Sequence, residues 1–75
     1  MRICDLPRTK MGGSIESPDG SAFYTFARVI DRGLTTYIAV YHTTDGFEFV
    51  TDIATTTSEL VDKVQRRHPA WTFHL

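Results

Sequence analysis

The chain has 75 residues, of which 41% are hydrophobic, 12% aromatic and 23% charged. This length allows one small domain, residues 1–75, and excludes a second, because independent folding units typically hold ~50–250 residues. The composition is too apolar for a disordered chain. Eight Lys and Arg residues against nine Asp and Glu residues give a net charge of −1. No overall electrostatic field therefore draws the protein toward nucleic acid or an anionic membrane.

Compartment signals are few. Cys4 has no second cysteine with which to pair. A lone thiol persists most easily in a reducing compartment, so we expect a cytoplasmic protein in which Cys4 is a small buried hydrophobe. The first residues lack the apolar run of a secretory signal, and no stretch of about 18 apolar residues occurs. We expect neither export nor a membrane span.

Residues 1–21 hold most of the turn-forming residues and are expected to be mostly loop. Pro18, Asp19 and Gly20 together favour a tight turn, since proline presets φ and glycine accepts a positive φ. Residues 14–16 then have two interpretations. They either pair back on the following strand as a short N-terminal strand, or remain part of the loop.

Three strand-length runs follow, at residues 22–30, 34–43 and 47–53, and they are rich in β-branched and aromatic residues. Turn residues separate them at 31–33 and 45–46. Short runs with short turns are typical of an antiparallel meander. The sequence therefore predicts three consecutive antiparallel strands.

The turns also predict the register. Two-residue turns place Phe23 opposite His42, Ala27 opposite Ile38, and Ile38 opposite Ile53. A three-residue loop with a glycine bulge would shift a hairpin by one residue. In the unshifted register, an aliphatic and Phe-rich face forms that we expect the helix to cover; its members are Phe23, Ala27, Val29, Ile38, Val40, Phe47, Phe49 and Ile53.

A helix is expected to begin at Thr56, because Thr56 and Glu59 have the spacing of a capping box, and to end before Pro69. Its apolar stripe is thin, with Leu60, Val61 and Val64 as the main members, so it must pack on the sheet. Its cations, Lys63, Arg66 and Arg67, form a secondary basic patch that we interpret mainly as a solvated face. Glu59 and Asp62 lie four residues before Lys63 and Arg66 and balance their charges.

Residues 70–75 alternate with period two, so that Trp71 and Phe73 share one face. We expect a fourth strand at a sheet edge, parallel to its neighbour after the helical crossover. The predicted fold class is α+β: a three-stranded antiparallel meander, one helix on one face and a C-terminal fourth strand.

The sheet face opposite the predicted core is unusually aromatic. Tyrosine, phenylalanine and arginine are enriched at the centres of protein interfaces. We therefore expect a protein-binding surface formed by Tyr24, Phe26, Arg28, Tyr37, Tyr41, Glu48, Val50 and Asp52. The competing interpretation is that residues 1–21 fold over this face as a second core layer. An edge strand provides a second route to protein binding.

The sequence thus favours a non-catalytic protein-binding module, such as a small inhibitor or adaptor. Small self-contained proteins of phages and other mobile elements often act in this way. One alternative is single-stranded nucleic-acid binding, with bases stacked on the aromatic face and Arg8, Lys10 and Arg28 near the phosphates. The acidic residues of that face and the net charge disfavour it. A second alternative is a homodimeric structural protein that associates through the same face.

Catalytic patterns are absent from the sequence. The three histidines, His42, His68 and His74, have neither metal-ligand spacing nor a paired cysteine motif. In the predicted register His42 points to the core side, whereas Glu48 and Asp52 point away. We therefore expect no metal, no cofactor and no enzyme activity, with His42 as a partly buried structural histidine.

Overall fold

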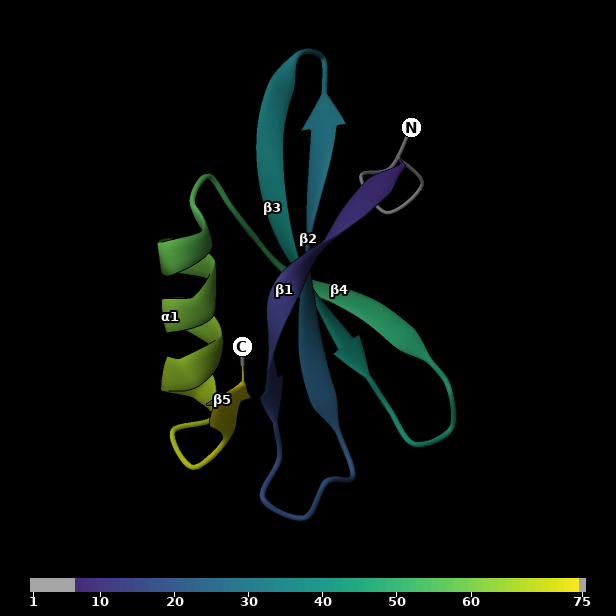
Figure 1. The fold of residues 1–75 in the computed structure, drawn as a ribbon, viewed down its shortest axis with the longest axis vertical. Coiled ribbons are helices and arrows are strands. Elements are labelled where there is room, and N and C mark those ends of the chain that lie inside the picture. The colour runs from purple at the N-terminus through teal and green to yellow at the C-terminus, as the bar shows by residue number, and fades with distance from the viewer. Residues whose placement is uncertain (1–6, 75) are drawn as a thin grey trace.

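The structure, a computed structural model, describes residues 7–74; Cys4 lies outside this range. It contains β1 (Arg8–Glu16), β2 (Phe23–Asp31), β3 (Leu34–His42), β4 (Glu48–Ala54), α1 (Thr57–Arg67) and β5 (Thr72–His74). The strands form one antiparallel sheet in the order β4-β3-β2-β1-β5. Figure 1 shows the strands strongly twisted, crossing near the middle of the view and splaying at both ends, with α1 alongside. The predicted α+β fold is confirmed.

The N-terminal strand exists and is longer than residues 14–16. β1 is nine residues long, and six of them pair with β2 on either side of an irregularity between Lys10 and Ser14. Gly12 and Gly13 lie in this bulge, and the φ of Gly13 is +98°. The sequence interpretation treated these glycines as loop, whereas their freedom lets β1 continue through a distortion. The expected turn at residues 18–20 is confirmed, since the N–H of Gly20 donates to the carbonyl of Ser17 at 3.0 Å.

The two central hairpins differ in how well the sequence predicts them. Phe23 pairs with His42 and Ala27 with Ile38, as expected, around a two-residue turn with positive φ at Arg32 and Gly33. The β3–β4 hairpin instead has a loop longer than the predicted two residues. A hydrogen bond from the N–H of Thr43 to the carbonyl of Phe47 closes this loop.

The longer loop shifts the start of β4 by one residue, so that His42 faces Glu48 rather than Phe49. A second irregularity between Ala39 and Val40 restores the predicted register, and Ile38 faces Ile53 as expected. Thr51 is the additional residue in β4. The consequence is that Glu48 and Val50 lie on the opposite sheet face from the one predicted.

α1 begins and ends as the sequence predicts. The hydroxyl of Thr56 accepts a hydrogen bond from the N–H of Glu59 at 3.2 Å. The helix ends at Arg67, and the N–H of His68 donates to the carbonyl of Val64 at 3.0 Å. Leu60 and Val64 are fully buried, because the thin apolar stripe is directed at the sheet.

β5 lies at a sheet edge as predicted, but it pairs antiparallel with β1, so the expectation of a parallel neighbour is wrong. The crossover does keep β5 running in the same direction as β4. It carries the chain past β3 and β2, however, to the far edge of the sheet, where β1 runs the opposite way.

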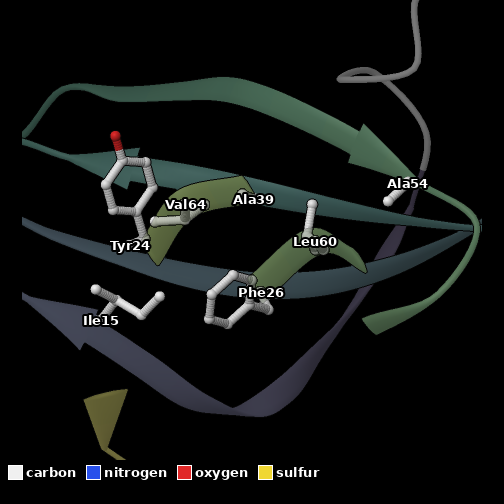
Figure 2. Packing of buried hydrophobic residues seen from close by; sticks show 7 residues of the cluster. All are labelled: Ile15, Tyr24, Phe26, Ala39, Ala54, Leu60 and Val64. Atoms are coloured by element: carbon white, nitrogen blue, oxygen red, sulfur yellow. The ribbon is translucent and has the colours of Figure 1, made fainter. Parts of the chain in front are cut away.

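The helix covers the other sheet face from the one predicted. Figure 2 shows the cluster beneath α1, which contains Ile15, Tyr24, Phe26, Ala39, Ala54, Leu60 and Val64. We call this side of the sheet the helix face. A second cluster, Ala27, Val29, Ile38 and Val40, contains no helix residue and lies on the opposite side, which we call the open face. Four of the expected core residues, Phe23, Phe47, Phe49 and Ile53, are exposed.

Small residues explain this choice of face. Ala39 and Ala54 are buried in the cluster beneath α1, and their short side chains let a helix approach the backbone of β3 and β4 closely. The aromatic rings of Tyr24 and Phe26 fill the space beside the helix. A tyrosine presents an apolar ring with a polar tip, so it suits a shallow core whose rim reaches solvent.

Candidate functional site

Most of the predicted binding face is under the helix. Tyr24 and Phe26 are only 2% and 3% exposed, and Tyr37 and Tyr41 are half-buried against the same cluster. Of the predicted set, Arg28 is exposed, and Glu48 and Val50 lie on the open face. The eight residues therefore do not form one exposed surface, because alternation defines two faces of a sheet without saying which one the helix covers.

A polar network closes the helix face at the C-terminal end of α1. The guanidinium of Arg67 donates to both carboxylate oxygens of Asp52, at 2.7 and 3.0 Å. Arg67 also reaches the hydroxyl of Tyr24 at 3.5 Å, and that hydroxyl lies 3.0 Å from Nε2 of His68. This network fastens the end of α1 to β2 and β4.

The network shifts the protonation of its members. The hydrogen bonds from Arg67 hold the pKa of Asp52 below its ordinary value, although burial acts in the opposite sense. The pKa of Arg67 is raised, first by its hydrogen bonds to Asp52. Burial lowers the pKa of His68, and the nearby charge of Arg67 lowers it further. The neutral form of His68 is therefore the favoured partner of the tyrosine hydroxyl.

The predicted basic patch is divided between two roles. Lys63 and Arg66 form the expected i,i+4 ion pairs with Glu59 and Asp62, at 3.5 and 2.9 Å. Arg67 points to the sheet instead and is neutralised by its bidentate contact. Three free cations therefore do not gather on the helix.

An exposed group of aromatic side chains continues the helix face beyond α1. Phe47 and Phe49 stack with ring centroids 6.3 Å apart, and they are 62% and 53% exposed. Phe49 lies opposite Tyr41 in the register, and Trp71 stacks on Tyr41 at 6.5 Å. We call these four residues the aromatic strip. It runs from the β4 edge across β3 toward the segment that precedes β5.

The open face holds a second arrangement that the sequence interpretation separated. The hydroxyl of Thr25 lies 2.7 Å from Nε2 of His42, and Nδ1 of His42 lies 3.4 Å from a carboxylate oxygen of Glu48. The ring of Phe23 stacks on the imidazole with centroids 4.6 Å apart. The expectation that His42 and Glu48 point to different sides is wrong, since the shifted hairpin register brings them together.

Arg8 and Lys10 also lie on the open face. They pair with Val29 and Ala27 of β2, two residues apart on β1, and neither makes an ion pair with another side chain in residues 7–74. The sequence interpretation placed them beside the tyrosines. Only the bulge and pairing of β1 decide that they share a face with His42 and Glu48.

Other features of the described segment are less specific. A hollow of about 480 Å³ lies among α1, β1 and β5, and Asp62 is the one ionisable residue among those that line it. Its other lining residues are apolar or neutral, and they form no cluster of charged or metal-binding groups. In residues 7–74, no helix is long and apolar enough to cross a membrane.

The features that the sequence interpretation missed are the exposed Phe47 and Phe49 and the histidine contacts of the open face. The Asp45-Gly46 turn does indicate the Phe47 and Phe49 positions, because a glycine bulge at this turn shifts the hairpin register by one residue. Comparison of the chain with protein-family models, curated proteins and solved structures gives no match.

Proposed function

We propose that the protein is a non-catalytic binding module that takes up an extended segment of another protein along the edge of β4. The observation that carries this proposal is the pair of exposed phenylalanines, Phe47 and Phe49, at an unpaired sheet edge. The edge route was one of the two that the sequence offered. The other route, through the tyrosine face, loses support because α1 covers that face.

The two sheet edges differ in their suitability for an added strand. Within residues 7–74, β4 has seven residues and pairs only with β3, whereas β5 has three residues. Natural edge strands are often protected by lysine, proline, a β-bulge or shortness. The segment Glu48–Ala54 contains neither lysine nor proline, and its bulge lies at Thr51, toward the end of the strand. Lys63 donates to the carbonyl of Ile53 at 3.2 Å, near the end of the strand. The preceding part of β4 is the better template for main-chain pairing.

Side chains along this edge supply apolar contact on both sheet faces. Phe47 and Phe49 extend the helix face, while Ile53, at 48% exposure, follows the open-face alternation opposite Ile38. Aromatic rings add contact area at low conformational cost. Covering the exposed half of one phenylalanine contributes about 0.8–1.5 kcal/mol, taking ~1.5–3 kcal/mol for a whole side chain.

The charges near the strip favour a protein segment over a polyanion. Arg67, the arginine of the polar network, already donates hydrogen bonds to both carboxylate oxygens of Asp52. Glu48 at the start of β4 adds a negative charge. Nucleic-acid binding depends mainly on free cations that neutralise phosphates, so single-stranded nucleic acid is the weaker candidate. We expect the module to act in the cytoplasm.

The test uses a displayed library of random 12-residue peptides. We expect enriched peptides with alternating apolar residues, and their binding should weaken about ten- to hundredfold in Phe47→Ser/Phe49→Ser, as a loss of ~1.5–2.7 kcal/mol gives. Amide hydrogen exchange in β4 should slow on binding. The matched control is Ile30→Ser/Leu34→Ser, which removes two exposed apolar side chains at the β2–β3 turn.

Three results would count against the proposal. These are no enrichment of extended apolar peptides, equal loss in the two double variants, and salt-sensitive oligonucleotide binding tighter than that of any peptide. Self-association in the absence of peptide, abolished only by the phenylalanine variants, would assign the β4 edge to a homodimer instead.

A further inference from the structure

The open face contains a hollow that the proposed function does not use. Its volume is about 300 Å³, and its lining includes Arg8 and Lys10 on the β1 side and His42 and Glu48 on the opposite side. A neighbouring hollow of about 310 Å³ shares Arg8 and Glu48 and extends along β4. Volumes of this size suit a small organic ligand.

The floor of the hollow is apolar. Ala27 and Val40 line it and are 4% and 2% exposed. Val50 packs against the same cluster and lines the neighbouring hollow. Because Ala27 and Val40 are almost fully covered, the partly buried Val50 offers most of the aliphatic surface that a ligand could contact.

One wall is cationic. Arg8 and Lys10 alternate on β1 and so project to the same side, where both line the hollow. Neither has an ion-pair partner within the described residues. A guanidinium and an ammonium beside an apolar floor are complementary to an anion that carries an apolar group.

The other wall is polar. The hydroxyl of Thr25 lies 2.7 Å from Nε2 of His42, and Nδ1 of the same ring lies 3.4 Å from a carboxylate oxygen of Glu48. Thr25 also lines the hollow, so its hydroxyl is a hydrogen-bonding group on the wall opposite the two cations.

The charged side chains around His42 determine how much negative charge a ligand in the hollow can carry. Glu48 faces it from β4, and Arg8 and Lys10 line the same hollow from β1. Because the carboxylate of Glu48 remains beside the site, a singly charged anion is favoured over a phosphate monoester or a polyanion.

We propose that this hollow binds a small monocarboxylate with an aliphatic or aromatic body. The carboxylate lies between Arg8, Lys10 and the Thr25 hydroxyl, and the body lies over the Ala27 and Val40 floor beside the partly buried Val50. This site lies on the open face, and it does not depend on peptide binding at the β4 edge.

The test is a titration of ¹⁵N-labelled protein with benzoate, followed by amide chemical shifts. Benzamide, a neutral molecule of similar shape, is the ligand control. We expect benzoate to shift the amides of Thr25, Ala27 and Val40 in a saturable way. Benzamide and inorganic phosphate should bind at least tenfold more weakly.

Variants distinguish this hollow from general charge attraction. Arg8→Gln/Lys10→Gln should weaken benzoate binding at least tenfold. Arg28→Gln/Arg66→Gln removes the same number of charges from other exposed positions and should leave the affinity within twofold. Thermal unfolding of each variant checks that the fold is intact.

The proposal is overturned if benzamide binds as well as benzoate, or if both double variants weaken binding equally. It also fails if benzoate produces no saturable shifts on the open face up to about 20 mM, the weak end of small-ligand affinity.

Discussion

The sharpest test of the fold compares two phenylalanines on the same strand. Phe26 is 3% exposed and lies beneath α1, whereas Phe23 is 38% exposed and stacks on His42 on the open face. The sequence alone predicts the reverse, with Phe23 in the core. Phe26→Ala and Phe23→Ala therefore form a matched pair that separates the two arrangements.

The expected costs follow from burial. Removing a buried phenylalanine side chain costs about 3–5 kcal/mol, because the lost transfer energy is joined by a cavity beneath Leu60. Phe23 buries somewhat over half of its surface and leaves no enclosed cavity, so its loss costs about 1–2 kcal/mol. A domain of this size has a free energy of unfolding of about 4–11 kcal/mol, so Phe26→Ala removes a large part of it.

Urea unfolding followed by Trp71 fluorescence measures both variants. With a slope of about 1 kcal/mol per molar urea, which suits a small domain, a difference of ~2 kcal/mol separates their midpoints by roughly 2 M. If Phe26→Ala is too unstable to measure, Phe26→Leu and Phe23→Leu can be compared instead. The Phe26 variant should again be the less stable of the two, with a smaller loss of stability. If Phe23→Ala lost as much stability as Phe26→Ala, the assignment of Phe26 to the covered face and Phe23 to the uncovered face would be refuted.

Three further predictions concern local interactions. Asp52→Asn should lower stability at neutral pH by weakening the Arg67 contact. Because the folded-state pKa of Asp52 is depressed, its contribution in the wild type is present above the unfolded-state value and is lost as pH falls through the folded-state value; acid unfolding of the two proteins should therefore converge at low pH. Gly13→Ala should destabilise the protein by about 1–3 kcal/mol, because its φ is +98° and an added Cβ would lie 3.2 Å from a phenylalanine ring of β5, whereas Gly12→Ala meets nothing within 4 Å. His68, which stacks on the single tryptophan at 3.9 Å, has a lowered pKa, so charging it costs stability as pH falls below its unfolded-state value, and the pH-dependent change in tryptophan fluorescence should have its midpoint below that of a free histidine.

Each of these has a result that contradicts it. A constant stability difference between wild type and Asp52→Asn down to low pH would refute the role of the carboxylate charge. Equal midpoints for the Gly12 and Gly13 variants, measured by urea unfolding, would show that the β1 bulge is not strained by a side chain. A fluorescence midpoint above the ordinary histidine value would mean that His68 is stabilised in its charged form.

The sequence by itself determined the elements after residue 21 and much of their register, but not β1, whose residues 8–13 were expected to be loop. The positions of β2 to β4, α1 and β5 follow from alternation, turn glycines and the Thr56 cap, all of which act between residues close in the chain. The β2–β3 pairing follows from a turn with positive φ at Arg32 and Gly33. These features depend on local backbone energetics, so the chain encodes them without reference to distant segments.

The tertiary structure alone decided which face is covered and which side chains meet. Both faces of β2 and β3 are apolar enough to form a core, so the alternation of apolar residues does not indicate which face the helix covers. Packing resolves it, because Ala39 and Ala54 leave room for Leu60 and Val64 beneath the helix. The same long-range choice exposes the β4 phenylalanines, and the register of a single hairpin brings Glu48 to His42.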